Sequence, residues 1–516
     1  MLSAALVLLL AASLSFVALL SVDRVYSGGA AKSGHGEEED AGGGTIRLRV
    51  TYPYIEGISD ISGLEEVQAA VNEITRKKIN VEIELLPVDA AERKTEYSLW
   101  LSRGDAVDLM LVKEPDLDYY IGRGFLNFFD GYLEHGADML WYFDEVRGRD
   151  LTEGTSWQGR IYGVANLSRQ KTRGYGLWGS REILETAGIS FDEGHIYSME
   201  EIGVILERLK QVYPDSYPLG QITFGQSDST VFQYMEAGDA LRSSGYTGVV
   251  RGENDQVVNL YATEEYRSFL NYMEDWYARD LVYPDGLIYD APVTELLRDQ
   301  TILMLPESSY PGTMDLLMGG ETDFVCLRTT EVRADNSREY WTVPTTSKYP
   351  RAAMQFLELM YRDQRIVWLL NRGVSGEHYR ITDNAYRLVE PIRSGDGAKG
   401  FYNPFFDLGD AEDVYDFGTP AQQMARGKYN GEEAGGESGR YAGFVYHSPD
   451  VTRQTDAVEK VLETYLPVLE SGAGDLEKDY AEFLDALEEA GINEILADKQ
   501  RQLDEWLTRR GRTSDL

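Results

Sequence analysis

Two periods of hydrophobic and polar residues follow one another along the first part of the chain. Residues 45–54 and 79–88 alternate apolar and polar side chains, which is typical of strands, whereas residues 63–78 place apolar side chains at helical spacing. The short apolar run at 105–112 is typical of a buried parallel strand. Strands that alternate with helices in this way predict an α/β sheet with helices on both faces.

The rest of the chain repeats this pattern with more helix. Helical spacing predicts helices at 181–189, 198–214 and 264–282, and short apolar runs predict further strands at 301–308 and 323–328. The last sixty residues predict two amphipathic helices that break at Ala490 and Gly491 and turn their apolar stripes to the core.

Polar and aromatic residues follow two of the predicted strands directly. Open α/β sheets bind ligands beyond the carboxyl ends of their strands. Tyr54 and Glu56 come at the end of the first strand, and Lys113 follows the buried strand that ends at Val112. These three residues are therefore candidate ligand contacts, with ordinary surface turns as the alternative.

The beginning of the chain is apolar. The first 22 residues have no charged side chain, and the run from Leu2 to Val22 is interrupted only by serines. As a helix this run would be roughly 31 Å long, enough to cross a bilayer. Residues 1–26 predict either a signal peptide or a signal anchor, and the glycine-rich, acidic residues 27–44 predict a flexible linker. Both alternatives place the following chain outside the membrane.

Length and charge narrow the class of protein. A chain of 516 residues predicts two or three structural units. Its 49 Lys and Arg against 87 Asp and Glu give a net charge of −38, which argues against nucleic acid as a partner because polyanions repel each other. The single cysteine, Cys326, permits no internal disulfide and no multi-cysteine metal site. Acidic pairs such as Asp116 and Asp118 predict solvated faces.

The segment LLNRGVSGEHY, residues 369–379, raises the question of a catalytic serine. A nucleophile elbow of the form G-x-S-x-G needs glycine two positions after the serine, but Glu377 stands there after Ser375. The apolar residues before this segment have helical spacing, so Gly373 predicts the end of a helix. The chain also has no phosphate-binding loop, no H-E-x-x-H and no complete EF-hand loop. No catalytic residue, cofactor or metal is therefore predicted.

Several segments, taken in order, resemble the extracellular solute-binding proteins that feed ABC importers, and among them the large carbohydrate-type lipoproteins of Gram-positive bacteria. These segments are 79–112, 156–167, 181–189, 345–379 and 486–506. The resemblance spans most of the chain after the linker. Three positions depart from the family: the cysteine that carries its lipid anchor is absent, Ala165 stands where proline is frequent, and Ser375 replaces a glutamate.

The resemblance implies an α/β, two-lobed, periplasmic-binding-protein-like fold of type II, with a ligand cleft between lobes joined by a three-strand hinge. The chain would cross near residues 165, 335 and 375. The implied N-terminal lobe is 45–165 plus 338–375, and the implied C-terminal lobe is 166–337 plus 376–516.

The function that the resemblance implies is capture of a sugar or oligosaccharide without catalysis. Closure of the lobes would deliver this ligand to ABC permease subunits in the membrane, and the protein would act as a monomer on the extracellular face, without a lipid anchor. Two alternatives stay open: a secreted glycoside hydrolase, which needs two carboxylates about 5–10 Å apart, and a sensor that presents its ligand to a membrane receptor.

Sugar binding requires flat apolar faces and planar polar groups that hydrogen-bond hydroxyls. The residues of these kinds nearest the expected crossings and strand ends are Trp157, Asn166, Arg169, Trp178, Glu307, Tyr310, Trp341, His378 and Tyr379. Each has a structural alternative: a core position for the aromatic side chains, a hinge or turn position for the polar ones, and a hydrogen bond donated to a backbone carbonyl for the histidine.

Overall fold

The computed structural model describes residues 44–513 apart from 56–58, 131–150, 153, 168–171, 193, 222–228, 242–245, 253, 285–292, 315–317, 319–322, 335–337, 386, 393–398, 404–407, 410–414, 418, 434–439 and 442–443. All described residues belong to the unit Glu38–Leu516. The predicted signal segment, 1–26, and the linker except Gly44 lie outside the described residues. Within the described part, no helix is both long and apolar enough to cross a membrane.

The first sheet has five strands in the order β2-β1-β3-β15-β6. The strands are β1 (Ile46–Tyr54), β2 (Val81–Asp89), β3 (Leu109–Lys113), β15 (Glu339–Thr342) and β6 (Val164–Asn166). β1 pairs in parallel with β2 and β3, while β15 runs antiparallel to β3 and to β6. The strands predicted from apolar alternation at the beginning of the chain are confirmed.

Helices cover both faces of this sheet. Along β3, Leu109 and Leu111 pack into one core, whereas Met110 and Val112 pack into another, because successive strand residues point to opposite faces. The helices around these two cores are α2 (Leu64–Ile79), α3 (Arg93–Arg103), α4 (Glu114–Gly122), α12 (Pro350–Arg362) and α13 (Gln364–Arg372). The short run at 105–112 is thus a strand buried on both faces, as predicted.

The second sheet has four strands in the order β13-β8-β12-β9. The strands are β8 (Tyr175–Ser180), β9 (Tyr217–Leu219), β12 (Ile302–Ser308) and β13 (Phe324–Arg328), and the neighbouring helices are α7 (Arg181–Thr186), α8 (Met199–Val212), α9 (Glu264–Ala278) and α10 (Val293–Arg298). β8 runs antiparallel to β12 and β13, and β12 is parallel to β9. α8 begins with a capping box in which Ser198 and Glu201 exchange hydrogen bonds.

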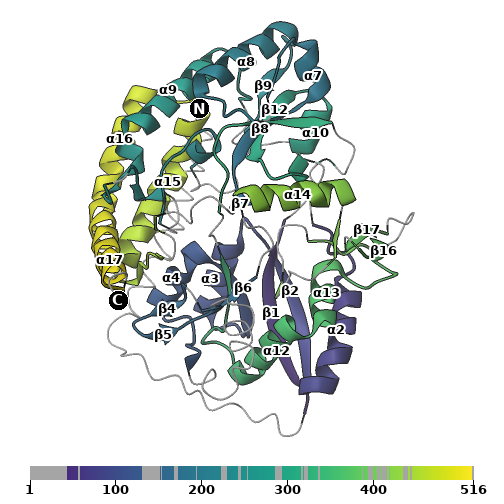
Figure 1. Ribbon diagram of the computed structural model, residues 1–516. Helices are drawn as coiled ribbons and strands as arrows, with labels where there is room; N and C mark the ends of the chain where they lie inside the picture. The colour runs from purple at the N-terminus through teal and green to yellow at the C-terminus, as the bar shows by residue number, and fades with distance from the viewer. Residues whose placement is uncertain are drawn as a thin grey trace, which may run out of the picture. The chain divides into compact units, whose positions relative to one another are not determined.

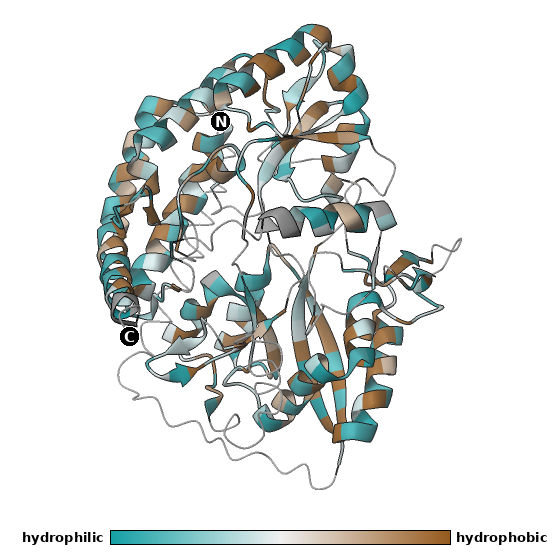
Figure 2. Cartoon of the chain, in the orientation of Figure 1, coloured by the Kyte–Doolittle hydropathy of each residue, from teal (hydrophilic) through white to brown (hydrophobic). Residues whose placement is uncertain are grey.

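The C-terminal helices α15 (Thr452–Ser471), α16 (Leu476–Ala490) and α17 (Ile492–Thr513) pack on the second sheet's core beside α9 (Figure 1). Figure 2 shows apolar and polar residues alternating along α16 and α17. The apolar stripe places Phe483, Leu487 and Leu503 in the core. The predicted helix break is confirmed at Gly491, whose φ of 93° suits glycine.

The remaining elements lie outside the two sheets. They are β4 (Ser156–Trp157), β5 (Arg160–Ile161), β7 (Thr172–Arg173), η2 (Val231–Gln233), β10 (Val249–Val250), β11 (Val257–Val258), η4 (Leu260–Ala262), β14 (Arg333–Ala334), β16 (Tyr379–Asp383), β17 (Leu388–Pro391), β18 (Asp416–Phe417), α14 (Pro420–Glu433) and η5 (Pro449–Val451).

The chain passes from the first sheet to the second between β6 and β8, and returns between β13 and β15. The segment after α13 differs from the expected assignment of 376–516 to the second lobe, because Phe401 and Leu408 pack in a core of the first sheet. Two amides hold this segment: Asn371 binds the backbone of Leu408, and Asn403 donates to the carbonyl of Pro53 at 2.9 Å.

Candidate functional site

Several predicted contact residues lie at one edge of the first sheet. β1 and β3 are parallel, so Tyr54 and Lys113 end their strands at the same edge. Across the next strands, Lys113 pairs with Glu339 and Glu339 pairs with Asn166. The sheet therefore places Tyr54 and Lys113 at one edge, as the carboxyl-end rule predicts, and Asn166 ends β6 at the same edge.

The polar groups at this edge are bonded to one another. The indole nitrogen of Trp341 donates to Asn166 Oδ1 at 3.0 Å, and the backbone N–H of Gly409 donates to the same oxygen at 2.7 Å. Arg93 pairs with Glu339 at 2.6 Å. Trp341 has no exposed surface and Asn166 is buried, so in this conformation both side chains pack inside the protein and stabilise the edge. Lys113 is exposed and Tyr54 is half-buried.

The second sheet presents an edge of the same kind. β12 and β13 end where the antiparallel strand β8 begins, so that Ser308 pairs with Tyr175 and Arg328 pairs with Gly176. The predicted residues Glu307 and Tyr310 lie at this edge. The chain leaves the edge of the first sheet after Asn166 and enters the edge of the second sheet at Tyr175. It leaves the second edge after Arg328 and returns to the first edge at Glu339, and we call these two connections the crossing segments.

Tyr310 is accompanied by two side chains from α14. The Tyr310 and Tyr429 rings meet edge to face with centroids 5.5 Å apart, and the Arg426 guanidinium lies 5.9 Å from the Tyr310 ring. The hydroxyls of Ser309 and Tyr429 are 2.6 Å apart. The turn after β12 thus combines an aromatic ring, hydroxyls and a guanidinium, which are groups suited to a polyhydroxylated ligand.

Glu307 and Trp178 lie closer to the strands. Glu307 is largely buried and accepts a hydrogen bond from the backbone N–H of Ser308 at 2.6 Å. Trp178 packs in the core between α10 and β12, and its indole nitrogen donates to the Ser308 carbonyl at 3.0 Å. The Trp178 side chain therefore fixes the end of β12, next to the Tyr310 turn.

A second group of aromatic residues at this edge was missed by sequence reasoning. The rings of Tyr175 and Phe232 meet edge to face at 4.8 Å, and those of Phe232 and Tyr246 stack at 5.2 Å with an angle of 17° between planes. All three side chains are half-buried. We call Tyr175, Phe232 and Tyr246 the aromatic platform. No sequence signal joins them, apart from the glycines that flank the Tyr246 turn.

The remaining described candidates lie elsewhere. Trp157 packs against His447, with ring centroids 5.7 Å apart. His378 and Tyr379 are buried, and His378 Nδ1 accepts a hydrogen bond from the backbone N–H of Val374 at 2.9 Å. Burial lowers the pKa of His378 despite nearby carboxylates. His378 thus bonds to a backbone N–H and not to a backbone carbonyl as the structural alternative expected. Glu56 and Arg169 lie outside the described residues.

The segment 369–379 is a helix end, as predicted. α13 finishes at Arg372, and Gly373 follows with a φ of 80°. An added Cβ on Gly373 would lie 2.3 Å from His378 Nδ1, so the close approach of the imidazole also requires glycine here. Ser375 follows a helix rather than a strand, which removes the geometry that a nucleophile elbow needs.

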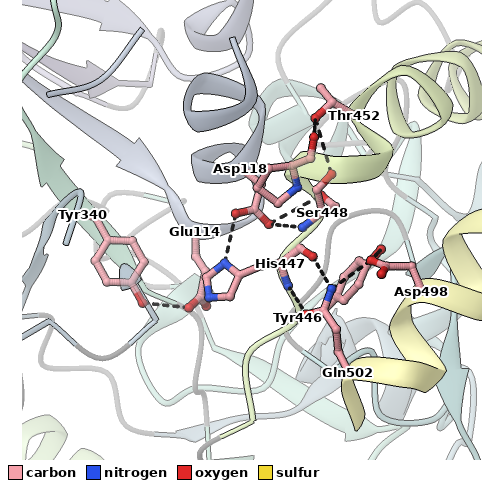
Figure 3. Close-up of polar contacts among 10 residues, drawn as sticks. Glu114, Asp118, Tyr340, Tyr446, His447, Ser448, Thr452, Asp498 and Gln502 are labelled. Atoms are coloured by element: carbon pink, nitrogen blue, oxygen red, sulfur yellow. Dashed lines mark hydrogen bonds and ion pairs between the residues drawn. The ribbon is translucent and has the colours of Figure 1, made fainter. Parts of the chain in front are cut away.

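The prediction of a solvated face at Asp118 is wrong. Asp118, on α4, is buried and faces the C-terminal segment in Figure 3. Its carboxylate accepts from the backbone N–H of Ser448 at 2.7 Å and lies 3.0 Å from His447 Nδ1. Ion pairs of Lys94 with Glu459 and of Arg123 with Asp456 extend this junction along α15. Asp118 is buried because a segment distant in the sequence packs on it. The spacing of residues around Asp118 does not indicate this contact.

Among the described residues, no three His, Cys, Asp or Glu side chains gather as metal ligands would. The chemistry available at the two edges is that of aromatic faces, hydroxyls, amides and a few charged groups. Such a site can bind a polar organic ligand through stacking and hydrogen bonds.

Two α/β units joined by crossing segments, with strand ends turned to those segments, define the type II fold of two-lobed solute-binding proteins. The chain is 21% identical, over 86% of its length and 88% of the relative, to a carbohydrate ABC transporter substrate-binding protein of Streptococcus pneumoniae serotype 4. Residues 440–508 match a family described as a domain of unknown function, DUF3502.

Solved structures agree with this fold. The N-glycan transport solute-binding protein NgtS of Streptococcus pneumoniae, in complex with Man5GlcNAc, superimposes with a TM-score of 0.70 at 17% identity, covering 90% of this chain and 99% of that one. A solute-binding protein of Bifidobacterium longum infantis associated with an HMO-binding ABC transporter gives 0.62 at 15% identity, with coverage of 90% and 99%. The resemblance to carbohydrate-type solute-binding proteins and the two-lobed fold are confirmed.

Proposed function

We propose that this protein is an extracellular solute-binding protein that captures a sugar or oligosaccharide and delivers it to an ABC importer. The observation that carries the proposal is the aromatic platform at the edge of the second sheet, where Tyr175 pairs with Ser308, two residues before Tyr310. Stacked ring faces bind the C–H surfaces of sugars, and the hydroxyl and guanidinium groups of the same edge bind sugar hydroxyls. The named relatives, which are substrate-binding proteins of ABC transporters, support this function.

The mechanism that we propose is lobe closure without catalysis. A ligand that contacts both sheet edges binds the closed arrangement more tightly, so it shifts the population toward closure. The permease subunits would recognise the closed form on the extracellular face of the membrane, where a monomer with an N-terminal anchor or an exported chain would act. Of the predicted residues, Tyr54, Lys113, Glu307 and Tyr310 are those that we expect nearest the ligand.

Calorimetric titration of residues 45–516 tests the proposal. The panel comprises Man5GlcNAc, a human-milk oligosaccharide, a fructo-oligosaccharide and maltodextrin. We expect saturable binding of at least one sugar, with no new reducing ends after prolonged incubation. Release of product would instead support a glycoside hydrolase, and failure of the whole panel to bind would contradict sugar capture.

A matched pair of variants locates the site. Phe232→Ala removes the central ring of the platform, whereas Phe191→Ala removes a half-buried ring that packs on the same core beside Arg181. Weaker binding in the first variant alone would support the platform as the contact surface. Equal affinities would place the sugar elsewhere.

A further inference from the structure

The C-terminal helices carry two buried charged residues that the proposed function does not use. Glu470 lies in the last turn of α15 with 3% of its surface exposed, and Lys499 lies on α17 with 1% exposed. Both belong to residues 440–508, the part that matches a domain of unknown function. Buried charges are unfavourable unless hydrogen bonds satisfy them, so their partners indicate what they hold.

Glu470 holds the turn that carries Phe232. Its carboxylate accepts from Ser229 Oγ at 2.6 Å, from Thr230 Oγ1 at 2.8 Å and from the backbone N–H of Thr230. Thr230 is the N-cap of η2, and Phe232 is the middle residue of η2. A further hydrogen bond, from Tyr266 OH at 2.8 Å, fixes the carboxylate from α9. Phe232 is therefore two positions after Thr230, whose hydroxyl and backbone N–H both bind the buried carboxylate of Glu470.

Lys499 holds the loop that carries Tyr246. Its side-chain nitrogen Nζ donates to the carbonyl oxygens of Ala240, at 2.8 Å, and Gly248, which lie on either side of Tyr246 in the sequence. An added Cβ on Gly248 would lie 3.3 Å from the Lys499 side chain, so helix and loop approach closely. Tyr246 itself has a φ of 52°, a conformation that bulky residues rarely adopt and that persists only where the surroundings impose it.

The rings of Phe232 and Tyr246 can stack only if their two segments keep a fixed position relative to each other. Phe232 and Tyr246 belong to different loops, yet their planes lie within 17° of each other. Hydrophobic packing alone is non-directional, whereas a carboxylate or ammonium group with several partners defines the position of each loop backbone.

We propose that Glu470 and Lys499 are positioning residues, through which the C-terminal helices set the Phe232–Tyr246 stack for the ligand. The inference gives the C-terminal segment a role in binding, and it rests on the proposed function for the identity of that ligand. The alternative is a purely structural role, in which the two residues stabilise the second lobe without governing the stack.

Hydrogen exchange separates these roles without any ligand. The variants are Glu470→Gln and Lys499→Met, which keep side-chain size, and the control is Tyr480→Phe. Tyr480 donates to the Tyr261 carbonyl at 2.8 Å, so the control removes a hydrogen bond between the same helices and the same lobe but outside the platform loops. We expect faster exchange confined to 229–235 in the first variant and to 246–250 in the second. No change there, or the same change in the control, would overturn the proposal. If Glu470→Gln does not fold, Ser229→Ala tests the same hydrogen bond from the loop side.

Titration with Man5GlcNAc and the other three sugars supplies the second readout. Affinity for whichever sugar the wild-type protein binds should fall about tenfold in each positioning variant, equivalent to the loss of about one aromatic contact, and stay unchanged in Tyr480→Phe. Unchanged affinity in both positioning variants would overturn the proposal. If the wild-type protein binds none of the four, the sugar assignment fails, while the exchange data still decide whether Glu470 and Lys499 set the stack.

Discussion

The edges of the two sheets present different kinds of side chains and support them differently. At the first edge, Asn166, Trp341 and Glu339 are strand residues, and the ladder of the sheet itself positions them. At the second edge, the rings of Phe232 and Tyr246 stand on loops outside the sheet, and side chains from α15 and α17 fix those loops. The ladder of a sheet already fixes the backbone of groups on strands, whereas groups on loops take their precision from whatever packs behind them.

The comparison predicts that removing a buried group of the first edge reduces stability, and that removing a platform ring of the second edge reduces affinity. Trp341→Ala gives the largest effect, because it removes a ring with no exposed surface and leaves the Asn166 amide without its indole partner. We expect the free energy of unfolding to fall by about 3–5 kcal/mol. Urea denaturation measures this change. A stable variant that has lost sugar binding would reverse the roles of the two edges.

A pH series sharpens the role of Lys499. Burial lowers the pKa of Lys499 to about 7, while Asp239 opposes the shift; the ring of Tyr446 also faces the ammonium group, at 5.3 Å. Above about pH 7 the unfolded chain binds a proton that the folded chain has released, so stability rises with pH. The rise should be about 2 kcal/mol between pH 7.5 and pH 9.

Urea denaturation at several pH values measures the contribution of Lys499. The difference in stability between wild type and Lys499→Met should change by that amount over this range. A difference that stays constant with pH would show that the folded protein keeps this lysine protonated.

Removing a platform ring should act on affinity. We expect Tyr246→Ala to weaken sugar binding by about 1.4 kcal/mol, or tenfold, because one stacked face is lost. The same change relieves little strain, since alanine also has a side chain at positive φ. Calorimetry beside the Phe191→Ala control checks this, and equal affinity in Tyr246→Ala and wild type would exclude this ring from the contact.

The junction between α4 and the C-terminal segment gives the smallest effect. Asp118→Asn keeps the shape of the side chain but weakens its hydrogen bonds to Ser448 and His447 (Figure 3). We expect a loss of about 1 kcal/mol in stability. The exposed Asp485, changed in the same way, serves as control. Equal effects in the two variants would mean that burial of Asp118 adds nothing to the junction.

The sequence predicted the place of a candidate residue well where the residue lies at the end of a strand, and poorly where it lies in a loop. The strand-end rule placed Tyr54 and Lys113 at one edge, where strand direction and register put them. Asn166, expected only from the resemblance, lies at the same edge. Aromatic character alone did not distinguish a ring in the core, such as Trp341, from one at a surface, because both are apolar. Phe232 and Tyr175 gave no signal, since 57 positions separate residues that touch only after folding.

The sequence by itself determined the elements: alternation marked β1 and β2, helical spacing marked α2 and the C-terminal helices, and Gly373 and Gly491 marked helix ends. These features depend on periods of two and 3.6 residues, so a short window contains them. Tertiary structure alone decided that Glu470 meets Thr230 across 240 positions, and that Asp118 is buried against a segment 330 positions away. Such contacts arise from how the packed elements meet, which local periodicity does not encode.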